Sequence, residues 1–273
     1  MTVLLSELID AFDQLWPRDQ AESWDAPGLV VGHPGQPVSR ILLTVDVTSE
    51  ILDEAIDGGF DLIVAHHPLL MRGIKFASED TAKGSILSRA IRANVAIFAA
   101  HTNADIVEDG VSDTLAKAFG LKDIKPLVAT AKAGEGHGRI GSLENPVSLG
   151  DFSRFISKVL PSTALGVRVA GDYDRQIETV ALCGGAGDSF IEAAMSSGAD
   201  VYVTSDLRHH PVQEAIETAA ASDREFALID ISHWAAEWLW LDSANRQIHQ
   251  RFDSLQVITS ELRTDPWTFA VTQ

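Results

Sequence analysis

Three short stretches of the chain carry histidine together with a second side chain that can bind a metal ion or move a proton. They are His66-His67, His101 with Asp105, and His233 with Glu237. Each follows an apolar run that predicts a strand, and open α/β sheets collect ligands at the carboxyl ends of their strands. Four imidazoles and two carboxylates exceed the needs of one tetrahedral ion but suit two ions ~3.5–4 Å apart. The sequence therefore predicts a two-metal centre.

Residue spacing supports this prediction at two of the three stretches. His233 and Glu237 are four residues apart in a predicted helix, so both side chains lie on one face. His101 and Asp105 have the same spacing, and either a helical turn or a tight loop suits the polar run between them. Taken singly, the stretches have plainer explanations, namely solvated loop histidines, helix caps or a surface hydrogen bond. Their recurrence at three strand ends favours the metal centre.

A second set of polar residues follows the predicted strand 201–204. Asp206 and His210 have helical spacing and are candidates for general acid or base, as is His101 if it is not itself a ligand. A helix cap with a solvated histidine is the alternative. Arg208, between them in sequence, could hold a substrate phosphate.

The run Gly184-Gly185-Ala186-Gly187 follows another predicted strand. It precedes a helix in which Ser189 and Glu192 form a capping-box pattern. N–H groups at such a turn could bind an anion, although a bare tight turn is the favoured interpretation.

The elements that must position these residues alternate between short apolar strands and helices, which predicts an α/β fold with the sheet covered on both faces. The expected strands are 41–45, 62–65, 95–100, 177–183 and 226–231, and the expected helices are 49–57, 81–93, 112–119, 189–197 and 234–241.

A weak internal repeat favours two related α/β lobes. An offset of 139 residues places Gly59 on Gly198 and Asp61 on Asp200, although any two βαβ units look somewhat alike. The glycine-rich stretch 131–145 is the expected boundary. We expect a first lobe of residues 1–127 with 229–273, which carries the metal ligands, and a second lobe of residues 128–228.

Composition narrows the classes of protein. The net charge is -18, from 39 acidic and 21 basic residues, with no basic cluster, which argues against nucleic acid as a partner. A phosphorylated small molecule is still compatible, because bound cations invert the local field. The single cysteine, Cys183, excludes an internal disulfide. No run approaches the ~20 apolar residues of a membrane helix, so we expect a cytoplasmic protein without a membrane partner.

With these motifs the sequence resembles the YbgI-like, or Nif-three-like, dinuclear metal proteins, often called GTP cyclohydrolase 1 type 2 homologs. The resemblance covers nearly the whole chain. It rests on Trp24-Asp25 with Gly28, Asp46, His66-His67-Pro68, His101-Thr102-Asn103 with Asp105, the run 184–187, Thr204 with Asp206 and His210, and His233 with Glu237.

The resemblance implies that the metal ligands proper are His66, His67, Asp105, His233 and Glu237, and that His101 is a sixth ligand or orients one. It also implies two lobes facing a cleft and self-association as a toroidal homohexamer. Ala26, Ser205 and Ser232 stand where the family has Asn, Gly and Gly, and the chain lacks the domain inserted in longer members. These departures concern the walls of the site rather than its ligands.

The expected function is a metal-dependent hydrolase, in which one ion lowers the pKa of a water and the other polarises the group attacked. The family name suggests a guanine nucleotide, and the alternative is a metal-binding assembly or regulatory protein without turnover. Imidazole and carboxylate donors suit zinc, iron, manganese, cobalt or nickel, so the two divalent ions are not identified by their ligands.

Overall fold

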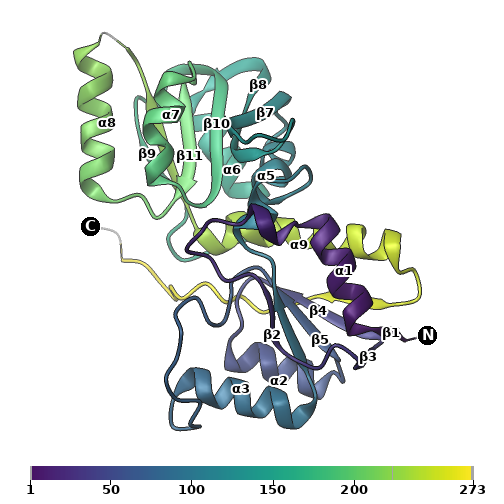
Figure 1. Cartoon of the computed structure of the whole chain (residues 1–273). Helices are drawn as coiled ribbons and strands as arrows, with labels where there is room; N and C mark the ends of the chain where they lie inside the picture. Colours follow the sequence, from purple (N-terminus) through teal and green to yellow (C-terminus); the bar gives the residue numbers. More distant parts are fainter. Residues whose placement is uncertain (1, 223, 272–273) are drawn as a thin grey trace. The chain divides into compact units, whose positions relative to one another are not determined.

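The computed structural model describes residues 2–222 and 224–271, and its contacts divide the chain into two compact units. The first unit is Met1–Ala104 with Leu241–Thr264, and the second is Asp105–Trp240 with Asp265–Gln273. Each unit has its own β-sheet flanked by helices (Figure 1), which confirms the predicted α/β class.

This division differs from the lobes expected from the sequence. The hairpin of β7 (Lys122–Ala129) and β8 (Gly136–Ser148) joins the second unit because β8 pairs along β10 (Gln176–Ala186). Met1, Asp223, Thr272 and Gln273, which the expected lobes include, lie outside the described residues. The candidate ligands are therefore divided: His66, His67 and His101 lie in the first unit, and Asp105, His233 and Glu237 in the second.

The first unit is built on a five-stranded sheet in the order β13-β4-β5-β6-β2. Its strands are β2 (Gly28–Val31), β4 (Arg40–Thr44), β5 (Leu62–Ala65), β6 (Ala96–Ala99) and β13 (Gln256–Thr259). β13, β4, β5 and β6 are parallel, and β2 lies antiparallel at the edge. A separate pair is formed by β1 (Val3–Leu4) and β3 (Pro37–Val38).

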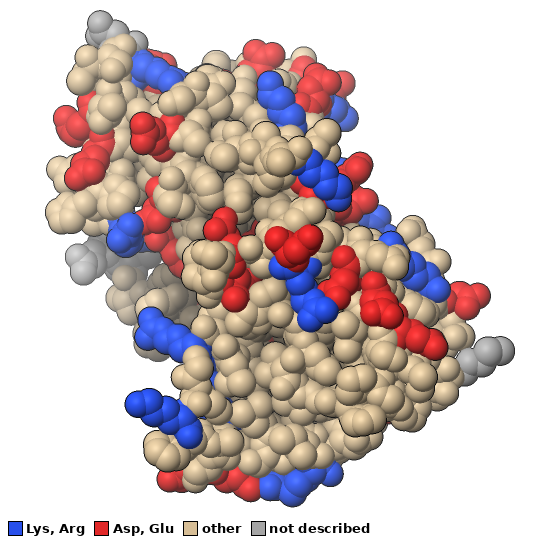
Figure 2. All heavy atoms as spheres, viewed as in Figure 1, with Lys and Arg blue, Asp and Glu red and all other residues tan. Residues whose placement is uncertain are grey.

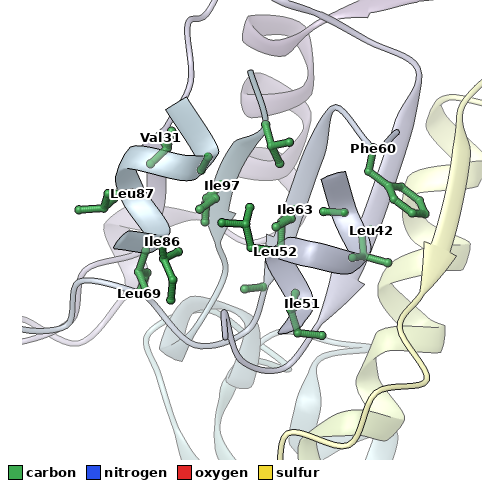
Figure 3. Packing of buried hydrophobic residues seen from close by; sticks show 14 residues of the cluster. Val31, Leu42, Ile51, Leu52, Phe60, Ile63, Leu69, Ile86, Leu87 and Ile97 are labelled. Carbon is green, nitrogen blue, oxygen red and sulfur yellow. The ribbon is translucent and has the colours of Figure 1, made fainter. Parts of the chain in front are cut away.

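Helices cover both faces of this sheet, as the uninterrupted apolar strands predict. They are α1 (Leu5–Leu15), α2 (Ser49–Asp57), α3 (Ala82–Ala93) and the end of α9 (His233–Arg251). α2 and α3 pack against buried strand residues such as Leu42 and Ile63 (Figure 3). On the opposite face α1 places Phe12 5.0 Å from Phe98 of β6, measured between ring centroids.

The second unit has a six-stranded sheet in the order β7-β8-β10-β11-β12-β9. The strands not yet given are β9 (Arg168–Ala170), β11 (Val201–Ser205) and β12 (Ala227–Ile231). Its helices are α5 (Val111–Ala118), α6 (Leu149–Val159), α7 (Ile191–Ser196) and α8 (His209–Ala221). β10, β11 and β12 are parallel, whereas β8 and β9 flank them antiparallel. α7 and α8 bury Ile191 and Ala215 against one face of these strands.

The two sheets repeat one another in register. β4 pairs with β5 through Ile41 and Leu62, and β10 pairs with β11 through Val180 and Val201, so both partners are displaced by the same 139 residues seen in the sequence. In both sheets another parallel strand and then an antiparallel edge strand follow. The predicted pair of related α/β halves is confirmed.

A matching pair of aspartates strengthens this repeat. Asp61 and Asp200 each accept hydrogen bonds from two consecutive backbone N–H groups at the start of the neighbouring strand. The donors are Ser39 and Arg40 for Asp61, at 2.7 and 3.0 Å, and Glu178 and Thr179 for Asp200, both at 2.8 Å. Gly59 and Gly198, two residues before each aspartate, both have positive φ. The loop that enters β5 is thus built like the loop that enters β11.

A buried ion pair stabilises the second unit. The Arg139 guanidinium is 1% exposed and donates from Nε to Asp113 at 3.1 Å. Asp113 also accepts from the backbone N–H of Asp109 at 2.9 Å and pairs with Lys117 at 2.7 Å. Burial alone would raise the pKa of Asp113, but the Lys117 hydrogen bond, the Asp109 N–H and Arg139 together lower it below its usual value.

Replacing Asp113 with asparagine should lower the free energy of unfolding by about 1–3 kcal/mol at neutral pH, because donors lose their charged acceptor. A carboxyl group whose pKa is lower in the folded chain stabilises the fold at pH values above its ordinary pKa of about 4. That stabilisation is lost as the pH falls through the pKa of the folded chain. The gap between wild type and Asp113→Asn should therefore close in acid. Urea titrations at pH 7 and pH 3 measure it, and the exposed Asp151→Asn variant is the control. If the difference in free energy of unfolding between wild type and Asp113→Asn were as large at pH 3 as at pH 7, Asp113 would not have a lowered pKa in the folded chain.

Two expectations from composition were that the chain has no membrane helix and no basic cluster. In the described part of the chain, no helix has both the length and the apolar character needed to cross a bilayer. On the face drawn in Figure 2, acidic and basic side chains are interspersed.

Candidate metal centre

Three histidines of the first unit lie together at one edge of its sheet. His66 and His67 directly follow β5, and His101 follows β6 by two residues. These strands are parallel and pair through Ala65 and Ala99, so their ends open at the same edge. The ring centroids are 5.1 to 5.4 Å apart, and one nitrogen from each ring lies within 4.8 Å of the others. The sequence prediction that these strand ends gather imidazoles is confirmed for this unit.

Each of the three rings is held through its Nδ1 atom. His66 Nδ1 lies 2.8 Å from the Ala100 carbonyl oxygen, and His67 Nδ1 lies 2.7 Å from Asp46. His101 Nδ1 lies 2.8 Å from Asp25. A carbonyl or a carboxylate can only accept, so in a neutral ring the proton is on Nδ1 and the lone pair is on Nε2. Metal-binding histidines are oriented by this same arrangement.

Asp25 anchors the loop that borders this cluster. Its side chain is fully buried and accepts from His101 and from the backbone and hydroxyl groups of Thr102. Burial would raise the pKa of Asp25, but the His101 and Thr102 hydrogen bonds outweigh it and lower the pKa to about 2. The loop also carries Trp24, which is 59% exposed and meets the His101 ring edge-on at 6.0 Å. Asp25 therefore stays ionised and fixes the orientation of His101.

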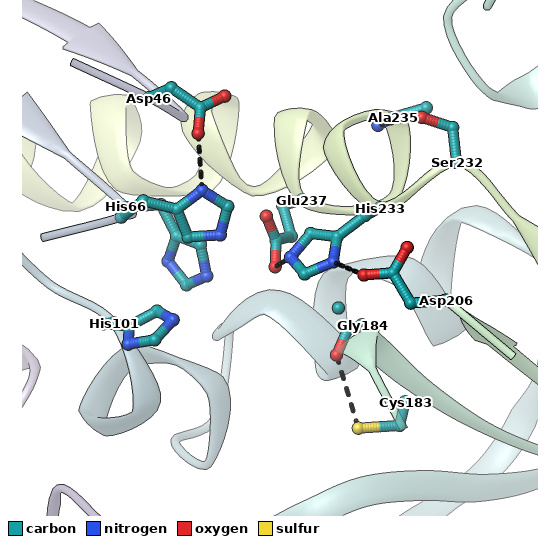
Figure 4. A network of polar contacts seen from close by, with 12 residues as sticks. Asp46, His66, His101, Cys183, Gly184, Asp206, Ser232, His233, Ala235 and Glu237 are labelled. Carbon is teal, nitrogen blue, oxygen red and sulfur yellow. Dashed lines mark hydrogen bonds and ion pairs between the residues drawn. The ribbon is translucent and has the colours of Figure 1, made fainter. Parts of the chain in front are cut away.

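In the second unit, His233 lies between two carboxylates at the start of α9 (Figure 4). Its Nδ1 is 2.7 Å from Asp206, and its Nε2 is 2.9 Å from Glu237, one helical turn along. The prediction that His233 and Glu237 share a helix face is confirmed. Burial would lower the pKa of His233, but the charge of Glu237 and the hydrogen bond to Asp206 raise it to about 11. In this unit the imidazole is thus protonated when no other cation balances the carboxylates.

Asp105 and Glu237 both lie near the buried thiol of Cys183. Burial raises the pKa of this thiol to about 12, and the charges of Asp105 and Glu237 contribute to the rise. Cys183 lies near the end of β10, two residues before Gly185, which packs against Glu237. Asp105 closes the single helical turn α4 (Thr102–Asp105), which is one of the two local structures that the sequence allowed.

The glycine run is explained by close packing around His233 and Glu237. Residues 184–186 belong to β10 rather than to a turn, and α7 begins at Ile191 after Phe190, so the predicted capping box is wrong. Gly185 has φ +70, and a Cβ built on it would lie 2.8 Å from Glu237 Oε1 and 3.5 Å from His233 Nε2. Only glycine gives this pair its space.

We predict that Gly185→Ala lowers divalent-metal affinity by about 10–100-fold, the size of effect seen when groups that orient ligands are changed. The matched control is Gly198→Ala, because Gly198 also has positive φ, +89, but a Cβ placed on it would meet nothing within 4 Å. Both variants bear a similar backbone strain of about 1 kcal/mol. Equal metal affinity in the two variants, measured with a competing chelator, would contradict the role of Gly185.

The structure changes the expected roles of the residues near β11. Asp206 has φ +57 and lies before α8, which begins at His209, so the predicted helical face shared by Asp206 and His210 is wrong. Ser205 ends β11, and the chain turns at Asp206 instead of entering the helix. Asp206 orients His233, and His210 lies in the first turn of α8.

The roles of Asp46, Asp25 and Gly185 were not predicted from the sequence, although each was among the motifs that carried the resemblance. Asp46 follows β4 and accepts from His67, while its second oxygen accepts from the Thr264 hydroxyl at 2.6 Å. The sequence did offer one sign of the role of Asp46, because this residue directly follows a predicted strand, as the candidate ligands do.

The donors present fit divalent metal ions. Three oriented imidazoles in the first unit and a histidine with carboxylates in the second are donors typical of zinc, iron, manganese, cobalt and nickel. The carboxylates of Glu237 and Asp206 that raise the pKa of His233 also favour a bound cation. These His and Glu groups can therefore hold metal.

Fold and site together define an α/β protein built from two related units, with His and Glu groups that can hold metal ions. Residues 3–266 match the family model for Duf34/NIF3 (NGG1p interacting factor 3). The chain belongs to the Duf34/NIF3 family.

Relatives resemble the chain over nearly its whole length. A Streptomyces coelicolor protein named GTP cyclohydrolase 1 type 2 homolog is 44% identical, covering 97% of this chain and 93% of that protein. The Mycobacterium tuberculosis protein of the same name is 31% identical over 375 positions, a span longer than this chain. Among solved structures, a Bacillus cereus protein related to NIF3 has a TM-score of 0.90 at 25% identity, covering 98% of this chain and 99% of that one.

Proposed function

We propose that the chain is a divalent-metal-dependent hydrolase acting on a nucleotide-like or phosphorylated small molecule. We assign His66, His67, Asp105, His233 and Glu237 as ligands of two ions. The observation that carries this proposal is the shared orientation of four histidines, each with Nδ1 on an oxygen acceptor. The names of the relatives support the substrate class.

Bound divalent ions would supply a water of lowered pKa and would polarise the group attacked. The chain's own residues orient the donors and move protons. His101, whose Nδ1 is engaged by Asp25, would accept or donate a proton at Nε2. Asp206 holds His233, and in the proposal Asp206 or His210 exchanges a proton with the leaving group.

The experiment is a turnover assay with metal-loaded protein and a panel of nucleotides and phosphate esters, with phosphate and formate release as readouts. His67→Ala and Asp206→Ala should each abolish release. His33→Ala is the control, because His33 lies in the first unit but outside the histidine cluster. Absent turnover, or turnover that survives both substitutions, would refute the hydrolase proposal.

A second candidate is a metal-binding assembly or regulatory protein without turnover. The burial of two proposed donors favours it, because His66 is 0% and Glu237 is 2% exposed, and structural metal sites are closed whereas catalytic sites keep an open position. In that case metal removal with a chelator would destabilise the protein strongly, while no substrate would be converted.

We also propose that the chain self-associates as a homohexamer, on the strength of its resemblance to the family. Mass photometry of the purified protein measures this directly. A mass of one or two chains at micromolar concentration would contradict the hexamer.

A further inference from the structure

The second unit contains a pocket that the metal chemistry does not use. It has a volume of about 330 Å3 and lies where β9, β12 and the start of α8 meet. Figure 1 shows α8 and β9 in this part of the unit. The side chains that matter below are Arg168, Leu207, Arg208, His209, Val212 and Gln213.

Arg168 is fixed at the wall of the pocket. Its Nε and Nη2 atoms both donate to Oδ2 of Asp230, with Nε at 2.8 Å, and Asp230 is only 9% exposed. The other Asp230 oxygen accepts from the Leu207 backbone N–H at 3.0 Å. Within the described residues, Nη1 of Arg168 makes no hydrogen bond to protein. The guanidinium is therefore held in place with donors still available.

Arg208, which also lines the pocket, has a similar arrangement. Its Nε donates to Asp188 at 2.5 Å, and no bond from its Nη atoms is found in the part of the chain that the structure describes. His209 and Gln213 follow on α8 and line the same pocket. Each aspartate thus orients one guanidinium group and leaves some of that group's N–H donors available. Paired N–H groups of a guanidinium can donate to two oxygens of one phosphate.

The remaining walls limit the kind of ligand. Leu207, Val212 and Leu228 give the pocket an apolar side. Its volume lies at the low end of the range for small-molecule sites, which run from ~300 to 1,000 Å3. A ligand that contacts both the arginines and the apolar residues therefore carries a compact anionic group on a small apolar body.

We propose that this pocket binds a phosphate monoester with a small apolar body, through Arg168 and Arg208. The site goes beyond the proposed hydrolase, because all of its contacts come from side chains and none requires a metal ion. It adjoins the metal chemistry in sequence, since Leu207 follows Asp206, which orients His233.

The test uses calorimetry with the full-length protein, freed of metal with a chelator and titrated with phenyl phosphate at low salt. We expect one site per chain, and Arg208→Gln should weaken binding at least about tenfold through loss of a charge-assisted hydrogen bond. Arg208 is 75% exposed, so the variant should fold. Val212→Trp, which fills the pocket and leaves both arginines, should abolish binding.

The matched control is Arg154→Gln, because Arg154 is 68% exposed and pairs with Asp151 in the same unit but away from the pocket. Its affinity should equal that of wild type. Binding unaffected by Arg208→Gln, or absent from metal-free protein that circular dichroism shows to be folded, would overturn the proposal, as would benzoate binding as tightly as phenyl phosphate. Metal content measured on the same variants separates this result from the hydrolase proposal, because Arg208→Gln should retain its ions.

Discussion

Replacing His67 with alanine is expected to lower the divalent-metal affinity of the chain by more than about 100-fold. The Nδ1 atom of His67 lies 2.7 Å from Asp46, which orients the ring. One ring nitrogen of His67 lies within 4.8 Å of a ring nitrogen of His66 and of His101. Loss of a group that only orients a ligand costs about 10–100-fold, and loss of the ligand itself should cost more. The side chain is 25% exposed, so alanine leaves little cavity and the fold should persist.

A graded series makes this expectation specific. Asp46→Asn keeps the shape of the residue that holds His67 and should weaken metal binding by about 10–100-fold. His33→Ala removes a histidine outside the cluster and should change nothing. Chelator competition gives all three affinities under one set of conditions. If His67→Ala and His33→Ala bound metal equally, His67 would not be a ligand.

Replacing Arg139 with methionine is expected to lower the free energy of unfolding by about 3–5 kcal/mol, because the buried Asp113 loses one of its two charged partners and four carbonyl oxygens lose their donor. Arg139 is 1% exposed and uses all three nitrogens. Besides Asp113, it donates to the carbonyl oxygens of Gly136, Gly138, Ile106 and Val107. The ammonium group of a lysine cannot donate to all of these acceptors at once, so Arg139→Lys should be nearly as destabilising as Arg139→Met.

The same arginine links stability to the candidate site. Ile106 and Val107 directly follow Asp105, so the guanidinium holds the backbone next to a proposed ligand. Urea unfolding measures the stability change, and Arg154→Met, at an exposed arginine of the same unit, is expected to stay within about 0.5 kcal/mol of wild type. A stability of Arg139→Lys within about 1 kcal/mol of wild type would show that the carbonyl contacts contribute little.

Local patterns predicted most of the elements around the site. The helix expected at 49–57 and the strand at 62–65 have those same bounds, because apolar periodicity, the Thr48 cap and the following glycine agree there. The repeat was detectable because both halves require an aspartate and a glycine at the same loop. α9 runs to Arg251, ten residues beyond the predicted end, because nothing in 242–251 breaks a helix.

What the sequence did not reveal depends on contacts between distant residues. The role of Asp25 depends on His101, which is 76 residues away, and that of Asp206 on His233, 27 residues away. The helical spacing of Asp206 and His210 was misleading because the chain turns through positive φ at Asp206 before α8 begins. Gly185 looked like part of a turn, since only the folded chain shows Glu237 against it.

The most direct test of the metal centre is elemental analysis of the purified chain after gentle reloading with zinc, iron, manganese, cobalt and nickel in turn. The proposed ligand set predicts about two divalent ions per chain, with a marked loss in His67→Ala and none in His33→Ala. Fewer than about one ion per chain under every loading condition, or equal content in all three proteins, would contradict it.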